Sequence, residues 1–174
     1  MKRQCGSAPP AGFSLMEIMV VIILLAIAAA IVIPRIGSAA DSQAVSAARV
    51  LKSDLEVARS LAVATQQPHS LVFSPDGQSY KVVANYTGGP YASAVAAAHP
   101  VVARKAYEVH LASENGMGQV TVVSASFGGA TYVTFNAQGD PSAAGVVTIR
   151  AGSTQMQVVL AGLTGTVTTT RIGG

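Results

Sequence analysis

Cysteine, aromatic residues and charge are scarce in this 174-residue chain, and each scarcity limits what the protein can do. Cys5 is the only cysteine, so the chain forms no internal disulfide and has no later thiol for nucleophilic catalysis. Charged residues make up 11% of the sequence and aromatic residues 5%. Two of the 11 basic residues, Lys2 and Arg3, lie at the N-terminal end of the sequence. The rest of the chain has 9 basic and 8 acidic residues. This balance gives no electrostatic basis for binding nucleic acid.

Patterns of catalytic or metal-binding residues are also missing. The three histidines have no metal-ligand spacing, and we expect them in loops or on the surface: His69, His99 and His110. Ser126 lies near Gly128 but lacks the strand–Ser–helix context of a nucleophile elbow. Asp76 and Asp140 adjoin turn glycines and are weak candidates for calcium ligands. We therefore expect no enzyme, no cofactor and no metal centre.

An unbroken apolar run near the N-terminus is the most informative feature that is present. From Phe13 to Ile33 there are 21 residues with one charge, Glu17. As a helix this run would be roughly 31 Å long, close to the thickness of a bilayer's hydrocarbon core. A carboxylate within such a segment is costly and calls for a partner or a purpose. The sequence therefore predicts a transmembrane helix with a functional acidic residue.

The segment from Gly12 to Glu17, Gly-Phe-Ser-Leu-Met-Glu, followed by this run resembles the prepilin signal of type IV pilins and type II secretion pseudopilins. The resemblance implies that a membrane-embedded prepilin peptidase cleaves after Gly12, on the cytoplasmic side, and methylates the new amine of Phe13. It also places Pro34 where many family members have a helix-kinking proline. Proline lacks an amide donor and disfavours helix at the residue before it, so a kink is expected there on physical grounds as well.

Glu17 acquires a role once the chain is cut. The new amine of Phe13 is mostly cationic at neutral pH. In a bundle of such helices, Glu17 of one subunit can neutralise the Phe13 amine of its neighbour and fix the axial register, as the family resemblance also implies. The alternative is that Glu17 only extends toward the lipid headgroups.

Two other interpretations of the N-terminus remain. A secretory signal peptide would end in a small-residue site such as 28–30 or 38–40, but this apolar run is too long for one. A plain signal anchor explains the length but not Gly12, Phe13 and Glu17. In both cases the positive charges of the leader keep it in the cytoplasm. We therefore expect a single-pass protein of the bacterial inner membrane, with its C-terminal head in the periplasm and later in a pseudopilus or pilus.

Beyond the apolar run, a second helical pattern extends to about Gln66 and ends before Pro68. Its apolar residues recur at steps of three and four: Val45, Ala48, Leu51, Leu55, Ala58 and Ala62. The charged residues, Asp54 among them, are predicted to lie mostly beside this stripe. The chain thus divides into a leader (1–12), a transmembrane and assembly helix (13–36), an amphipathic half of the helix (37–67) and a β-rich head (68–174).

In the head, short alternating segments replace the helical period. Residues 70–73 and 79–83, joined by Pro75-Asp76-Gly77, predict a β-hairpin, and a loop rich in Gly, Ala and Pro follows at about 85–100. Further strands are predicted at 101–111, 118–124, 130–135, 146–150, 155–160 and 165–170. The expected fold class is α+β, with a long N-terminal helix, transmembrane and then amphipathic, packed on an antiparallel sheet as in pilins.

A second resemblance concerns the head. The stretch 51–62, then Pro68, and later 133–139 and 157–167 are similar to the minor pseudopilin H and FimT-type minor pilin domain. FimT-type members that bind DNA have several arginines around the final strand. Here only Arg150 and Arg171 are candidates, and even as neighbours across a sheet they would make a weak phosphate site. DNA uptake is therefore disfavoured.

Together these features and the two resemblances predict a non-enzymatic minor pseudopilin assembled with other pseudopilins, and the resemblance implies a type II secretion system first. A minor pilin of a type IV pilus or of a DNA-uptake pseudopilus is the first alternative. The second is a periplasmic module that carries a prepilin signal and binds a ligand through the 85–100 loop or through Tyr80, Tyr86 and Tyr91. For these tyrosines the competing interpretation is that they anchor the packing of loops.

Overall fold

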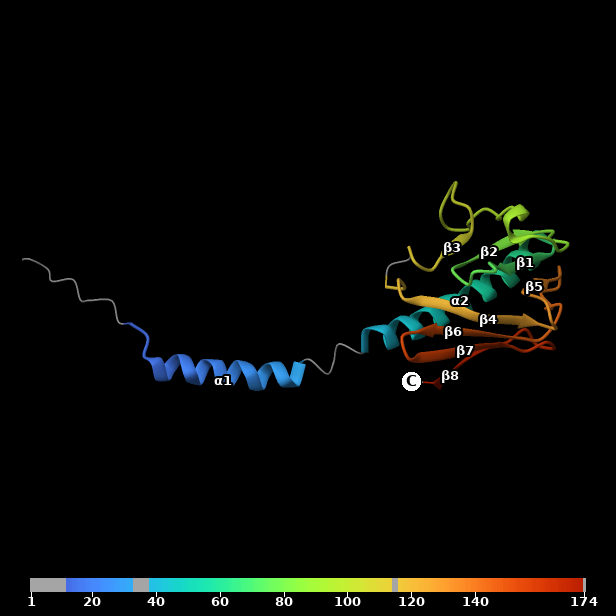
Figure 1. The fold of residues 1–174 in the computed structure, drawn as a ribbon. Helices are drawn as coiled ribbons and strands as arrows, with labels where there is room; N and C mark the ends of the chain where they lie inside the picture. Colours follow the sequence, from blue (N-terminus) through green and yellow to red (C-terminus); the bar gives the residue numbers. More distant parts are fainter. Residues whose placement is uncertain (1–11, 33–37, 114–115, 174) are drawn as a thin grey trace, which may run out of the picture. The chain divides into compact units, whose positions relative to one another are not determined.

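The computed structural model describes residues 12–32, 38–113 and 116–173. The chain separates into two units, Met1–Gly37 and Ser38–Gly174, and each is described by itself. The first contains helix α1 (Leu15–Val32), and the second, the head, contains helix α2 (Ser38–Thr65) and the strands (Figure 1). The strands are β1 (His69–Phe73), β2 (Ser79–Ala84), β3 (Glu108–His110), β4 (Val120–Phe127), β5 (Tyr132–Phe135), β6 (Gly145–Ala151), β7 (Thr154–Leu160) and β8 (Val167–Gly173).

Helix α1 occupies most of the predicted apolar run. It begins at Leu15, after Ser14, and is described as far as Val32. No helix in the described ranges is long and apolar enough to cross a membrane. The predicted span, Phe13–Ile33, extends beyond α1 and includes a residue outside the described part. The predicted kink at Pro34 and the continuity of the two helices also fall outside it.

Helix α2 buries the predicted stripe of small and apolar residues, with two differences. Ala44 and Ala47 are buried, whereas Val45 is only partly buried. Asp54, predicted to lie beside the stripe, is 8% exposed, because two tyrosine hydroxyls of the head reach it. The helix ends at Thr65, where Gln66 adopts a left-handed φ of 54° and Pro68 follows two residues later.

Two antiparallel four-stranded sheets pack with α2 around a common core. The strand orders are β3-β2-β1-β5 and β4-β6-β7-β8, and α2 contacts strands of both sheets. In Figure 1, α2 runs along the strands of the head. The alternation of buried and less buried residues in β6 and β7 turns one face of the second sheet inward. The largest buried side chains of the core are Tyr80, Phe135, Leu51, Leu55, Leu71, Ile149 and Leu160.

The predicted hairpin is confirmed, since β1 pairs with β2 from His69–Ala84 to Phe73–Tyr80. The later strands are confirmed with ends shifted by up to three residues. The strand predicted at 101–111 is largely wrong, because only Glu108–His110 pairs with β2. Residues 101–107 instead form bends and turns, with an isolated bridge between Ala106 and Ala98 and a left-handed φ of 64° at Arg104. The 85–100 loop contains one short 3-10 helix, Tyr91–Ser93.

Candidate assembly site

The start of α1 is defined by a cap in which Ser14 and Glu17 take the two key positions. The Ser14 carbonyl accepts hydrogen bonds from the Glu17 and Ile18 amides, at 3.0 and 3.2 Å. The Ser14 hydroxyl accepts one from the Met16 amide at 3.3 Å. Glu17 is therefore the third residue of the helix, and Ser-x-x-Glu is the capping-box sequence. Its carboxylate also complements the positive end of the helix dipole.

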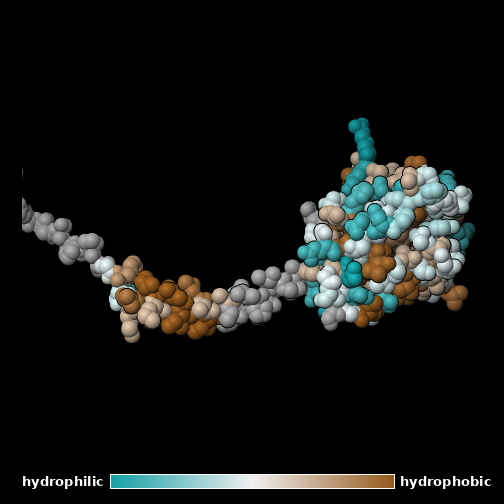
Figure 2. Space-filling view, viewed as in Figure 1, coloured by the Kyte–Doolittle hydropathy of each residue, from teal (hydrophilic) through white to brown (hydrophobic). Residues whose placement is uncertain are grey.

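The apolar surface of α1 is uncovered in the single chain. From Leu15 to Ile27 its large apolar side chains are between 47% and 78% exposed. They surround the helix on all sides rather than forming one stripe, and Figure 2 shows the hydrophobic colouring concentrated along this element. Exposed apolar surface of this extent is typical of helices that contact lipid or other apolar helices.

Gly12 and Phe13 precede the cap and are exposed, Phe13 to 77%. A Cβ placed on Gly12 would meet no atom within 4 Å. The described fold therefore has no steric need for glycine at this position. Cleavage after Gly12 and methylation of Phe13 stay predictions.

In the head, a buried polar cluster joins α2 to the first sheet. The Tyr80 hydroxyl donates to Asp54 Oδ2 at 2.5 Å, and the Tyr107 hydroxyl donates to Asp54 Oδ1 at 2.8 Å. Burial and the neighbouring Asp54 carboxylate raise the pKa of Tyr107 well above its usual range. The cluster is enclosed by core residues, so its role is to hold the helix on the sheet.

Tyr86 and Tyr91 also act within the head. The Tyr86 hydroxyl donates to the Gly89 carbonyl at 2.6 Å, and its ring packs edge-on against Tyr132. The Tyr91 hydroxyl donates to Glu108 at 2.9 Å, and the Lys81 ammonium lies 4.1 Å from the ring centroid. Burial raises the pKa of Tyr91 to about 12. Together with buried Tyr80, these contacts favour packing anchors over ligand contacts.

The remaining candidate residues are dispersed. His69 is 4% exposed, which corrects the expectation of a surface position, and its Nδ1 lies 3.0 Å from the Gln67 carbonyl oxygen. His99 packs on Tyr107, and His110 lies 3.8 Å from Glu108. In the described ranges no three His, Cys, Asp or Glu residues come close enough together to hold a metal ion.

The two carboxylates proposed for calcium are each used by their own turn. Asp76 accepts hydrogen bonds from the Ser74 hydroxyl at 2.6 Å and the Gln78 amide at 2.9 Å. The Ser74 bond, followed by that of Gln78, lowers the pKa of Asp76. Asp140 lies 3.3 Å from the Asn136 amide nitrogen. These bonds give both carboxylates a local structural role.

Arg150 and Arg171 do not form a joint phosphate site. Arg150 pairs with Gln155 of β7, while Arg171 lies one strand further, in β8, opposite Met156. Arg150 is exposed, whereas the Arg171 guanidinium lies 3.8 Å from Asp41 and donates to Thr154 at 3.1 Å. Arg171 therefore ties β8 to the start of α2.

Sequence reasoning missed a groove of about 640 Å³ between α2 and the start of β8. Its lining includes Arg59 and Val63 of the helix and Gly165 of the β7–β8 loop. The only sequence signal was a pair of turn glycines, Gly139 and Gly165, which are far apart along the chain but both approach Arg59.

Comparison with solved structures finds a protein that shares the fold of the head. The minor pseudopilin EpsH from the type 2 secretion system of Vibrio cholerae superposes with a TM-score of 0.52 at 11% identity, covering 75% of this chain and 97% of EpsH. Two crystal structures of the type IV minor pilin FimU from Pseudomonas aeruginosa have TM-scores of 0.48 and 0.49, at 17% and 16% identity. They cover 72% and 76% of this chain and 90% of FimU. No curated protein sequence matches the chain significantly.

The family match identifies the protein more specifically than the similarity in fold does. The model of the family described as type II transport protein GspH matches residues 47–164, about two thirds of the chain. The match begins in α2 and ends after β7, so it covers most of the head. Pseudopilins and pilins are structural subunits and not enzymes. Because the family model matches more than half of the chain, the chain belongs to the type II transport protein GspH family, and its head has the fold of a minor pseudopilin.

Proposed function

We propose that this protein is a minor pseudopilin of a type II secretion system, made as a membrane-anchored precursor and assembled through its N-terminal helix. The observation that carries the proposal is α1, whose large apolar side chains are exposed around the whole helix while a single carboxylate lies in its first turn. The GspH family match supports the choice of secretion system.

In this proposal the apolar run Phe13–Ile33 holds the precursor in the inner membrane, with the head in the periplasm. Prepilin peptidase cleaves after Gly12 and methylates the Phe13 amine. The subunit then moves from lipid into the filament, where α1 exchanges lipid contacts for helix contacts. Because both surroundings are apolar, close packing and charge pairing decide the specificity of this step more than hydrophobicity does.

Glu17 contributes the charge pairing, since its carboxylate can neutralise the Phe13 amine of a neighbouring subunit. The cap at Ser14 suggests a different role, in which Glu17 only supports the start of its own helix. The two roles predict different outcomes for conservative variants. Glutamine retains the capping-box pattern but carries no charge, so Glu17→Gln loses the pairing with a neighbouring subunit and, within its own helix, only the small dipole contribution.

The experiment measures how much protein enters sheared filaments in cells that contain the complete machinery. We expect Gly12→Val to stay uncut and Glu17→Gln to be cut but not incorporated. We expect Ser14→Ala, which weakens the cap and keeps the carboxylate, to be cut and incorporated. Normal incorporation of Glu17→Gln would contradict charge pairing. Normal incorporation of uncut Gly12→Val would contradict the whole assembly proposal.

Deleting the gene for this protein tests whether the subunit serves a secretion system or a pilus. A type II pseudopilin is required for export of folded proteins, so we expect the exoprotein content of the medium to fall. Twitching motility and DNA uptake should remain. The reverse result would assign the protein to a type IV pilus or to an uptake pseudopilus.

A further inference from the structure

Strand β8 forms an exposed edge of the second sheet. Among the described strands it pairs only with β7, and residues 168–172 are all exposed. Edge strands are usually protected by lysine, proline or a covering segment. Residues 167–170 of β8, Val-Thr-Thr-Thr, contain no charge and no proline and have high β propensity, while Arg171 and the register shift beside it lie at the end of the strand. Its outer edge is therefore able to accept a further strand.

The backbone groups at this edge follow from the β7–β8 turn. The Ala161 amide donates to the Thr166 carbonyl at 3.0 Å, so residue 166 turns its polar backbone groups toward β7. In an antiparallel pair this direction alternates along the strand. The N–H and C=O groups of Val167, Thr169 and Arg171 therefore point to the free edge, and those of Thr168 and Thr170 point to β7.

Beside this edge, one flank of α2 is uncovered. The helix runs antiparallel to β8, since Asp41 lies near Arg171 and Arg59 lies near Gly165. The groove of about 640 Å³ separates them at one end, and a hollow of about 310 Å³ follows the same flank toward the helix start. Six of the helical residues that line the two recur at steps of three and four: Val45, Arg49, Lys52, Glu56, Arg59 and Val63.

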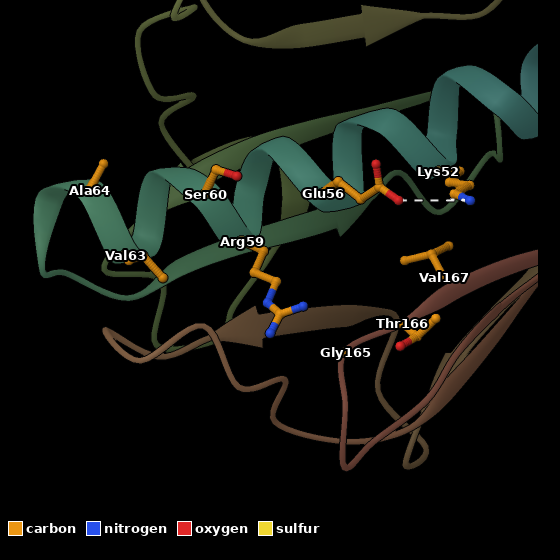
Figure 3. A pocket seen from close by; sticks show the side chains of 9 residues that line it. All are labelled: Lys52, Glu56, Arg59, Ser60, Val63, Ala64, Gly165, Thr166 and Val167. Atoms are coloured by element: carbon orange, nitrogen blue, oxygen red, sulfur yellow. Dashed lines mark ion pairs between the residues drawn. The ribbon is translucent and has the colours of Figure 1, made fainter.

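The groove carries uncompensated positive charge. Lys52 lies 3.8 Å from Glu56, and Figure 3 shows this pair apart from the Arg59 guanidinium, which points toward the loop of Gly165. Arg49 and Arg59 form no ion pair with any residue in the described ranges. The groove therefore favours a ligand that brings carboxylates.

Two glycines leave room for the Arg59 side chain. Gly139 and Gly165 both have a left-handed φ, of 86° and 65°, and both approach the Arg59 side chain. A Cβ on Gly165 would lie 3.2 Å from Arg59 Cζ, and one on Gly139 would lie 3.1 Å from Nε. The missing Cβ atoms leave room for the Arg59 side chain beside both loops, and no carboxylate in the described ranges pairs with it.

We propose that the groove between α2 and β8 binds an extended, acidic segment of another filament subunit, which adds to the edge of β8 as a strand. Backbone bonds to Val167, Thr169 and Arg171 would supply affinity, and a carboxylate on Arg59 would supply specificity. A second copy of this chain is a poorer partner, because pairing two β8 edges adds arginines and no acid. The inference rests on the proposed function, since it requires a neighbour in the filament.

The test uses the full chain in assembled filaments, with a photoreactive residue at Val63, which lines the groove and is 43% exposed. Thr169→Pro removes an edge-facing N–H and spares the pairing with β7. Its control, Thr169→Val, keeps the N–H and the β-branched shape. Arg59→Glu reverses the charge in the groove, and Arg150→Glu makes the same change at an exposed site elsewhere in the second sheet.

We expect the cross-linked peptide to come from a different filament subunit and to contain Asp or Glu. Thr169→Pro and Arg59→Glu should each lower its yield by about tenfold, the effect of losing roughly 1.4 kcal/mol of binding. The two controls should retain the yield, and thermal unfolding must show that all four variants are folded. A cross-link to DNA, to lipid or to a second copy, or one that Thr169→Pro leaves unchanged, would overturn the inference.

A second photoreactive site at Ile22 in α1 separates this inference from the proposed function. Ile22 is 59% exposed and reports helix contacts in the filament. Cross-links from Ile22 without any from Val63 would overturn the groove inference alone. Loss of both would overturn filament assembly and, with it, the binding proposed for the groove.

Discussion

Removing the carboxylate of Asp54 tests how the helix that leads into the head is held on its sheet. Asp54→Ala deprives the buried hydroxyls of Tyr80 and Tyr107 of their acceptor. A buried polar group that loses its hydrogen bond costs about 1–3 kcal/mol. For two hydroxyls we therefore expect the free energy of unfolding to fall by about 2–6 kcal/mol.

The same reasoning predicts strong non-additivity. Tyr80→Phe and Tyr107→Phe each remove a donor to a buried carboxylate, so each should cost about 1.5–3 kcal/mol. The triple variant removes the carboxylate and both hydroxyls together, so no polar group of the cluster stays buried without a partner. The triple variant with Asp54→Ala should therefore lose clearly less stability than the sum of its three single variants.

Urea titration and thermal melting of the full chain in detergent, followed by circular dichroism, measure these changes. For a unit of the size of the head, each kcal/mol corresponds to about 3–4 °C in Tm. Asp54→Ala should therefore lower Tm by roughly 7 °C or more. A change below about 2 °C, or strictly additive effects of the three substitutions, would refute a tightly coupled cluster.

Three further predictions concern the head. Gly145→Ala places a Cβ against the ring of Phe127, so we expect urea melting to show a loss of about 1–3 kcal/mol, and an unchanged midpoint would contradict this packing. Burial raises the pKa of Tyr91 from 10.0 to about 12, and that of Tyr107 also rises, so the folded chain holds these protons more tightly than the unfolded chain. Stability should therefore be complete below about pH 10 and fall as the pH rises toward 12, with a shallower fall in Tyr107→Phe, measured as urea midpoints against pH. Arg171→Ala breaks a half-exposed contact with Asp41 and should cost at most about 1 kcal/mol, so a loss of several kcal/mol would show that β8 depends on it.

Local patterns in the sequence predicted much of the fold. The hairpin of β1 and β2 depends on a turn at Asp76-Gly77 and on neighbouring alternation, both visible in a short window. The stripe of α2 follows from helical spacing alone. The strand predicted at 101–111 failed because its alternation is interrupted by Arg104, whose left-handed conformation turns the chain away from the sheet.

The head's contacts between distant residues were not predictable in the same way. Asp54 is buried because Tyr80 in β2 and Tyr107, just before β3, reach it from 26 and 53 positions later in the chain. Arg59 lines a groove because two distant loops approach it through glycines. The N-terminal site differs again, because Gly12, Phe13 and Glu17 were recognised from a motif, and the structure adds the local cap that Ser14 gives the helix.

The central claim is that the N-terminus is a prepilin signal, and intact mass with N-terminal sequencing tests it most directly. The protein is produced with and without a prepilin peptidase. The account predicts that the peptidase removes residues 1–12 and leaves Phe13 at the N-terminus with one added methyl group. A chain left uncut in its presence, or one cut after Ala30 or Ala40, would contradict the account.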